Sequence, residues 1–308
     1  MLFGYKSADE IRRRFHLKIW NIYNFFVTYA LLDGWAPNPK ARVPKPENVL
    51  DKWIIARLNQ TIKVVTECLE KYDAFPAASE IEKFVDDFSL WYIRRSRDRV
   101  GPAAESEKDK IAFYRTTYFV LHNLSRLMAP FMPFLSEAIY QNLTKSDSVH
   151  LSDFPTALDL RSAETKMITE MEIARKVAEM AHAVRKEKAI PVRQPLLQLT
   201  ASNYQFSKEV ALQIARELNV KYVVSKGGKG EIKIKLDTKI SPELAREAEV
   251  RDLVRKIQEE RKRLGLNLNQ EVNVWTENIP DDKKLLSWMT QKAQINKLSQ
   301  GKFRVVKH

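Results

Sequence analysis

The sequence predicts a mainly α-helical protein, in which an antiparallel helical bundle is followed by a small α+β domain. In the first half, apolar residues recur at spacings of three and four over long stretches that are separated by short breaks. In the second half, short apolar runs suited to strands alternate with helical patterns. We therefore expect the bundle over residues 1–155, a connecting helix and junction over 156–195, and the α+β domain over 196–308.

Local signals mark the ends of the helices expected in the bundle. Asn48 is suited to cap the second helix, Gly101 and Pro102 stop the third, and Pro133 suits the first turn of the fifth. A proline-rich linker, WAPNPKARVPKPEN, separates the first helix from the second. The expected helices cover residues 9–32, 50–69, 77–100, 108–128 and a stretch that begins at Pro133.

The second half begins with one long helix and continues with alternating strands and helices. The glycine-rich run GGKG lies between two expected strands, where a hairpin turn is the default interpretation. No internal repeat is evident in the sequence. The expected helices cover residues 162–188, 205–218, 241–264 and 281–298, and the expected strands cover 196–201, 220–225, 231–236, 271–276 and 303–306.

The charge of the chain points to a polyanionic partner. The formal net charge is +13 and the pI is near 9.6, and residues 151–308 carry 30 basic against 21 acidic side chains. The single cysteine, Cys68, excludes an internal disulfide. No signal peptide is recognisable, and the apolar run at 17–32 is interrupted by polar residues and too short to span a membrane. We expect a cytoplasmic protein that has no membrane partner.

No residue pattern indicates catalysis or a metal site. The histidines lack metal-ligand spacing, no serine or cysteine lies in a nucleophile elbow, and no glycine-rich phosphate loop occurs. The adjacent carboxylates Asp86 and Asp87 point about 100° apart on a helix, so they cannot share a substrate. We therefore assign no catalytic and no metal-binding residues.

The stretch FSLWYIRRSRDRVGP, residues 88–102, is the strongest candidate for a binding site. On a helical wheel Arg95 and Arg99 continue the aromatic face that includes Trp91, whereas Arg94 and Arg97 flank that face or point away. Two interpretations stay open. The arginines form ion pairs with carboxylates of the bundle, or they bind phosphate while Trp91 stacks on a base.

A second basic cluster surrounds the break IPVRQP between the long helix and the first strand. It comprises Lys186, Lys188, Arg193 and Gln194, which could join two domains or contact a nucleic-acid backbone. The arginine-rich helix at 241–264 is more simply a solvated face, with contact to RNA as the alternative.

The first helix carries a polar stripe made of Asn21, Asn24 and Thr28, which lie within about 60° of one another. We interpret the stripe as a helix–helix contact with satisfied amides.

These segments together resemble the C-terminal region of isoleucyl-tRNA synthetase, a class I aminoacyl-tRNA synthetase. The resemblance follows the same order along almost the whole chain, and valyl-tRNA synthetase is the nearest alternative. It rests on WNIYNFFVTYALLDGW, LDKWIIARLN, LWYIRRSRDR, MAPFMPFLSEAIYQNL, SVHLSDFP, RKEKAIPVRQPL and LDTKISPELAREAEVRDLVRKIQEERKRLGLN.

The resemblance implies an anticodon-binding bundle followed by a junction domain, with isoleucine tRNA as the partner. The HIGH and KMSKS motifs of the catalytic domain do not occur, so the chain alone is expected to be non-catalytic and to hold no cofactor. ATP and Mg²⁺ would belong to a separate catalytic segment. The candidate tRNA-binding residues are Arg94, Arg95, Arg97, Arg99, Trp91, Lys186, Lys188, Arg193 and Gln194. The alternatives are a general RNA-binding accessory protein and a helical protein-interaction scaffold.

Overall fold

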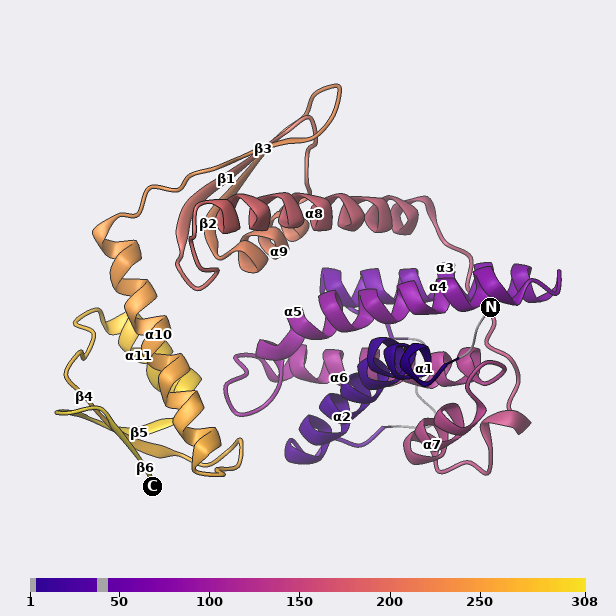
Figure 1. Cartoon of the computed structure of the whole chain (residues 1–308), viewed down its shortest axis with the longest axis horizontal. Helices are drawn as coiled ribbons and strands as arrows, with labels where there is room; N and C mark the ends of the chain where they lie inside the picture. Colours follow the sequence, from indigo (N-terminus) through magenta and orange to yellow (C-terminus); the bar gives the residue numbers. More distant parts are fainter. Residues whose placement is uncertain (1–3, 38–43) are drawn as a thin grey trace. The chain divides into compact units, whose positions relative to one another are not determined.

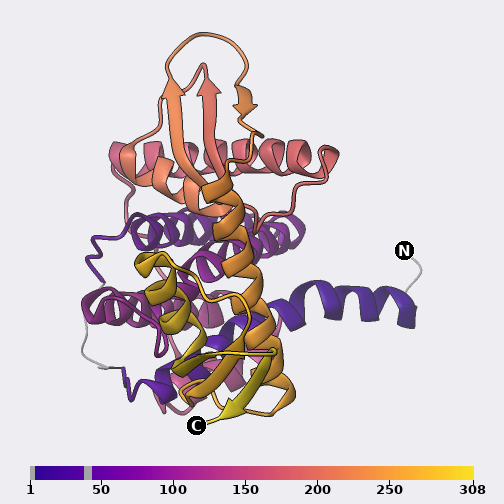
Figure 2. The same cartoon turned by 90° about the vertical axis from the view of Figure 1, so that its left-hand side faces the viewer.

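The computed structural model describes residues 4–37 and 44–308, so part of the predicted proline-rich linker lies outside the described residues. The chain divides into two compact units. Figures 1 and 2 show helices throughout the first unit and both helices and strands in the second. The predicted fold class, a helical bundle followed by a small α+β domain, is confirmed. The first unit comprises Met1–Val100 with Ala104–Thr169, and the second comprises Glu170–His308 with Gly101–Ala103.

The first unit is built from long helices that pack against one another. Asn48 caps its helix as predicted, since its Oδ1 accepts a hydrogen bond from the Leu50 N–H at 3.0 Å, and Pro133 lies in the first turn of α7. The elements are α1 (Tyr5–Ile11), the π-helical η1 (Arg12–His16), α2 (Leu17–Leu32), α3 (Val49–Leu69), α4 (Ala74–Asp86), the π-helical η2 (Asp87–Ile93), α5 (Arg94–Ser96), the 3-10 turn η3 (Arg97–Arg99), α6 (Glu107–Met128), α7 (Pro133–Thr144) and the 3-10 turn η4 (Val149–Leu151).

An aromatic row fills the core of the bundle. The rings of Phe84, Phe88, Tyr92 and Phe113 follow one another with centroid separations of 6.0, 5.6 and 5.8 Å, and all four side chains are fully buried. The row joins η2 to α6, so it fixes the end of the bundle where the arginine-rich stretch begins.

The third predicted helix is not a uniform α-helix. After α4 the winding loosens into the π-helix η2, passes through one short α turn and tightens into η3. The consecutive residues Trp91, Tyr92 and Ile93 of this segment are all buried, so the segment packs on more than one side. This irregular segment carries the arginines that the sequence singled out.

The second unit holds two three-stranded sheets with mixed strand directions. The first sheet has the order β2-β1-β3 and the second the order β5-β4-β6. The elements are α8 (Ser162–Glu187), whose residues up to Thr169 belong to the first unit, β1 (Leu196–Ser202), α9 (Lys208–Leu218), β2 (Val220–Lys226), β3 (Lys233–Leu236), α10 (Pro242–Arg263), β4 (Val272–Thr276), α11 (Lys283–Ala293), β5 (Ile295–Gln300) and β6 (Arg304–Lys307).

Two sequence-based expectations are wrong in this unit. GGKG is not a hairpin turn, because β2 and β3 both pair with β1 and lie on opposite sides of it. The helix predicted over 281–298 ends at Ala293, where Gln294 adopts a left-handed conformation with φ 53°, and the chain continues as β5. Pairing with the central strand β4 overrides the helical pattern of this polar segment.

The second unit contains the same arrangement twice, although the sequence showed no repeat. In each copy a long helix precedes the central strand, an 11-residue helix leads to a parallel edge strand, and the last strand pairs antiparallel on the other edge. The two copies are α8-β1-α9-β2-β3 and α10-β4-α11-β5-β6. Both short helices end at a left-handed residue, Asn219 in one copy and Gln294 in the other. The expectation of no internal repeat is therefore wrong.

Candidate nucleic-acid interface

Arg99, the last arginine of the predicted site, is buried in an ion-pair cluster. Its Nη1 and Nη2 donate to the two carboxylate oxygens of Asp51 at 2.7 and 2.6 Å, and its Nε donates to Asp109 at 2.8 Å. The guanidinium also lies over the ring of Phe113, 5.6 Å from its centroid. Asp51 has no exposed surface. Arg99 therefore joins η3, α3 and α6, and its donors are engaged inside the bundle.

Burial and charge shift the pKa values in this cluster. Burial alone would lower the pKa of Arg99, but the hydrogen bonds and charge of Asp51 outweigh it and raise the pKa above its usual range. The pKa of Tyr92 is raised by burial and by the charge of Asp51, to which its hydroxyl donates at 2.7 Å. Arg99 therefore stays charged and the Tyr92 hydroxyl stays protonated at neutral pH.

The other candidates on this stretch divide as the helical wheel predicts. Arg94 and Arg97 are exposed, whereas Arg95 is partly buried. Trp91 is only 6% exposed, so its ring packs in the bundle and cannot stack on a base in this conformation. Arg97 is the best placed of these residues to contact a ligand.

Arg97 borders an open groove of about 280 Å³ on the surface of the bundle. The polar stripe of α2, made of Asn21, Asn24 and Thr28, forms the other side of this groove. The stripe was expected to be a buried helix–helix contact, but all three side chains are exposed. The expectation is wrong because α2 buries its opposite face, with Ile22 and other apolar residues, and leaves the stripe in solvent.

Ion pairs hold η1 and α2 beside α4, which continues into the segment that carries Arg97. Arg14 pairs with Glu82 at 2.7 Å, and one turn later Lys18 pairs with Asp86. Both partners advance by four residues, so the two helices run in the same direction at this contact. In the part of the chain that the structure describes, Arg97 itself makes no ion pair and no hydrogen bond. The groove therefore combines a charged guanidinium with neutral amide and hydroxyl groups.

The second predicted cluster serves mainly to hold the connector between α8 and β1. Arg193 pairs with Asp252 of α10 at 2.5 Å. The side-chain amide of Gln194 donates to the carbonyl oxygen of Leu244 at 3.1 Å, and Lys188 donates to Thr238 at 3.4 Å. Lys186 is exposed and, among the described residues, has no such partner. Only Lys186 in this cluster is available to a ligand without breaking a contact.

Sequence reasoning missed Arg185, which is 1% exposed at the end of α8. Its guanidinium donates to the carbonyl oxygens of Leu218 at 2.6 Å and of Pro191 and Gln194 at 3.1 Å each. The signal was present, because Arg185 lies four residues after the buried Ala181 and so continues the apolar face of α8.

Arg261 of α10 occupies the equivalent place in the second copy. It is 5% exposed and donates to the carbonyl oxygens of Gln270 at 2.6 Å and Ala293 at 3.5 Å. The correspondence is close: Leu218 and Ala293 each end the short helix, and Gln194 and Gln270 each lie two residues before the central strand. Both arginines are therefore structural.

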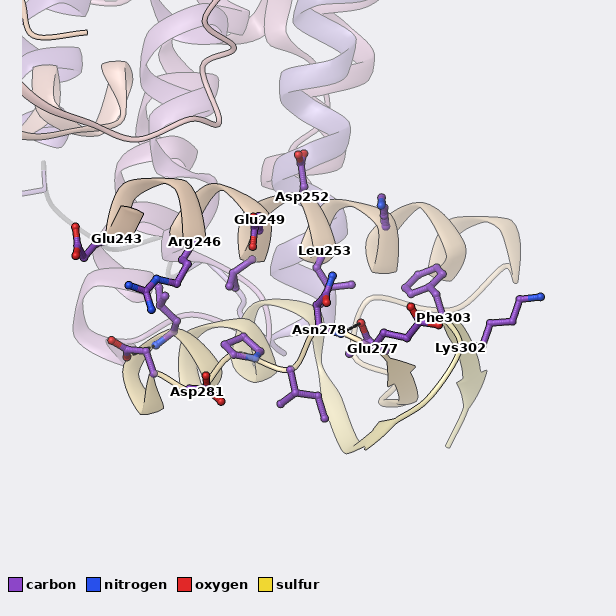
Figure 3. Close-up of a pocket in the computed structure, with 17 residues that line it drawn as sticks. Glu243, Arg246, Glu249, Asp252, Leu253, Glu277, Asn278, Asp281, Lys302 and Phe303 are labelled. Atoms are coloured by element: carbon purple, nitrogen blue, oxygen red, sulfur yellow. Dashed lines mark hydrogen bonds between the residues drawn. The ribbon is translucent and has the colours of Figure 1, made fainter. Parts of the chain in front are cut away.

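A groove of about 890 Å³ in the second unit lies between α10, the loop before α11 and the β5–β6 turn. Figure 3 shows Glu243, Arg246 and Glu249 of α10 facing a loop that carries Asp281, with Lys302 at one end. Six carboxylates and three cationic side chains line it. An excess of carboxylates repels phosphate, so this groove does not suit a polyanion.

The described residues contain no cluster of histidine, cysteine and carboxylate side chains that could hold a metal ion. His122 stacks between Tyr118 and Tyr140, and burial followed by the charge of Arg126 lowers its pKa to about 4. The described helices include none that is long and apolar enough to cross a membrane.

Comparison with known proteins identifies the family. Residues 51–201 match the model of the anticodon-binding domain of tRNA ligase. An isoleucine–tRNA ligase from Dehalococcoides mccartyi is 37% identical over 298 residues, which cover 88% of this chain and 29% of the relative. Isoleucine–tRNA ligases from Protochlamydia amoebophila and Thermus thermophilus are 41% and 40% identical, each over 72% of this chain and 22% of the relative.

The chain thus spans between 22% and 29% of the length of these relatives. All three are isoleucine–tRNA ligases, so the valyl alternative receives no support from them. The match to the anticodon-binding domain covers the segment that carries Arg97 and Arg99 and extends into β1. On these grounds the chain belongs to the isoleucine–tRNA ligase family and carries the anticodon-binding domain.

Proposed function

We propose that this chain is the tRNA-binding part of an isoleucine–tRNA ligase and that it holds isoleucine tRNA for ATP-dependent charging by a separate catalytic segment. The observation that carries the proposal is the exposed groove of the bundle, in which Arg97 faces the amides of Asn21 and Asn24 and the hydroxyl of Thr28. An arginine binds a phosphate group bidentately, and amides and hydroxyls bind sugar and phosphate oxygens without regard to base sequence.

The other arginines of this stretch fit the proposal, because one of them has a structural role and one is exposed. Arg99 holds the helices in place through Asp51 and Asp109 and leaves Arg97 unengaged among the described residues. The net charge of +13 supplies the long-range attraction for a polyanion. Arg94 is exposed on the same stretch and is the second candidate for a phosphate contact.

Binding of isoleucine tRNA to the purified chain, measured as a function of salt, tests the proposal. We expect the affinity to fall steeply as the salt concentration rises. Arg97→Ala should weaken binding and should also make the salt slope, the slope of log affinity against log salt concentration, shallower by about 1. Arg161→Ala is the matched control, because Arg161 is an exposed arginine of the same unit that lies outside the groove.

The outcomes separate the proposal from its alternatives. Equal affinity for isoleucine tRNA and unrelated tRNAs would support a general RNA-binding protein instead. Absence of any salt-dependent tRNA binding would support a protein-interaction scaffold. Equal effects of Arg97→Ala and Arg161→Ala would remove the groove from the interface.

We infer that ATP and Mg²⁺ bind to the catalytic segment and that the complete enzyme acts in the cytoplasm. The chain alone should therefore not catalyse ATP–pyrophosphate exchange. Exchange activity of the purified chain, which retains the groove but carries no HIGH or KMSKS motif, would overturn this part of the proposal.

A further inference from the structure

The first sheet leaves one face open, and strand pairing fixes which side chains lie on it. Leu199 and Ala201 of β1 have no exposed surface, because α8 and α9 cover their face of the sheet. Side chains alternate along a strand and directly paired residues share a face, so Gln198, Thr200 and Ser202 lie on the opposite face. The side-chain amide of Gln198 donates to Thr200 Oγ1 at 2.9 Å, as expected of neighbours on one face.

The register adds a tyrosine and three lysines to this open face. On one edge Tyr222 pairs with Gln198 and Lys226 with Ser202. On the other edge Lys235 pairs with Thr200 and Lys233 with Ser202. Tyr222 is 62% exposed. A sheet spacing of about 4.8 Å between strands places Lys226 and Lys233 on either side of Ser202, about 10 Å apart at their backbones.

The second sheet repeats this composition on its own open face. Val272 and Val274 of β4 face the helices and are fully buried, so Asn273 and Trp275 face the other way. Arg304 pairs with Trp275 and lies over its ring at 6.0 Å, and Lys297 pairs with Asn273. Each copy therefore presents one aromatic ring and at least two cationic side chains.

These faces differ from an ordinary solvated surface in their charge pattern. Three of the five arginines of α10 pair with a carboxylate, as in the pairs Arg255–Glu259 at 2.6 Å and Arg263–Glu260 at 2.8 Å. On the strand residues of the two open faces there is no carboxylate, and the lysines there have no ion-pair partner among the described residues. The carboxylates that flank β3 in the sequence are Glu231, two residues before Lys233, and Asp237, which accepts a hydrogen bond from the backbone N–H of Lys239.

We propose that the open faces of the two sheets bind unpaired nucleotides of the tRNA, with a base stacked on Tyr222 and phosphates held by Lys226, Lys233 and Lys235. This inference rests on the proposed function and extends it to residues 202–308, which lie beyond the match to the anticodon-binding domain. A flat face with an exposed aromatic ring suits unstacked bases, since every base has a π-face and a duplex conceals it. Lysines on both edges suit the backbone on either side of such a base.

Binding of isoleucine tRNA to the Tyr222→Ala variant of the full chain tests the proposal. Loss of one base stack corresponds to a drop in affinity of about 5- to 150-fold. Tyr222→Phe should retain binding, because it keeps the ring. Tyr72→Ala is the matched control, because Tyr72 is 96% exposed and belongs to the other unit. Replacement of Lys226, Lys233 and Lys235 by Gln should lower the salt slope by about 2, at about 0.7 for each phosphate of a single strand.

A short unpaired oligoribonucleotide and the same strand annealed to its complement provide the second probe. We expect the parent chain to prefer the unpaired strand and Tyr222→Ala to lose that preference at an unchanged melting temperature. If the parent binds tRNA and Tyr222→Ala binds it equally well, this inference fails while the proposed function stands. If the parent binds no tRNA, the proposed function fails and this inference fails with it.

Discussion

Replacement of Arg99 by leucine should destabilise the bundle without altering a phosphate contact. The substitution leaves the carboxylate of Asp51, which has no exposed surface, with only the Tyr92 hydroxyl of its three hydrogen-bond donors. Removal of one partner of a buried ion pair costs about 3–5 kcal/mol, and the remaining hydroxyl favours the lower end, about 3–4 kcal/mol. For a unit of this size, that cost lowers the melting temperature by about 6–16 °C.

Thermal and urea unfolding of Arg99→Leu and Arg97→Ala measures this difference between two arginines of one short segment. Arg97 is exposed and has no ion pair among the described residues, so its removal should change stability by less than about 0.5 kcal/mol. Replacement of Asp51 together with Arg99 by apolar residues should restore part of the loss, since no buried charge is then left alone. The reasoning is refuted if Arg99→Leu has the same melting temperature as the parent protein. It is also refuted if Arg99→Leu stays folded and weakens tRNA binding more than Arg97→Ala does.

Three further predictions follow from buried or capping groups. Arg185→Ala should destabilise the second unit by about 3 kcal/mol, because it leaves several buried carbonyl oxygens without their charged donor. The control is Lys186→Ala, which removes an adjacent exposed side chain and should hardly change stability. Urea unfolding measures both variants. The pKa of His122 is about 4 in the folded state and about 6.5 when unfolded, so the unfolded state binds the proton first and stability should fall as the pH drops from about 6.5 to about 4. The loss is at most about 3 kcal/mol and less for a partly exposed ring, and an unchanged pH dependence of unfolding in His122→Phe would contradict the assignment. Asn48→Ala should lower the stability of the bundle by about 1 kcal/mol through loss of the α3 cap, as measured by thermal unfolding, with the exposed Lys52→Ala as the control.

The sequence periodicity predicted well which side chains are buried, but it predicted poorly which residues contact one another. The helical wheel placed Arg99 inward and Arg97 outward, because spacing along a helix records which side faces the core. It could not name Asp51, which is 48 residues away from Arg99 in the sequence and reaches it only through the packing of η3 against α3. The polar stripe of α2 was misassigned because α2 also exposes apolar residues such as Trp20 and Leu31. Its composition is therefore similar to that of a helix that is buried on all sides. The segment of β5 was predicted to be helical because its polar residues make an edge strand only when β4 lies beside them.

Because the second unit contains the same arrangement twice, equivalent positions of the two copies can be compared within one sequence. Arg185 and Arg261 are each followed by a lysine and, nine positions after the arginine, by a glutamine, and the left-handed residues Ala189 and Gly265 lie four positions after each arginine. Positions that agree between the copies are those that the architecture needs, namely the buried guanidinium and the reversal of the chain beneath it. Positions that differ are not fixed by this architecture: the aromatic ring lies on the edge strand in one copy, at Tyr222, and on the central strand in the other, at Trp275. A comparison within one sequence thus separates residues that the shared architecture requires from residues that it leaves open, and the two sheet faces belong to the second group.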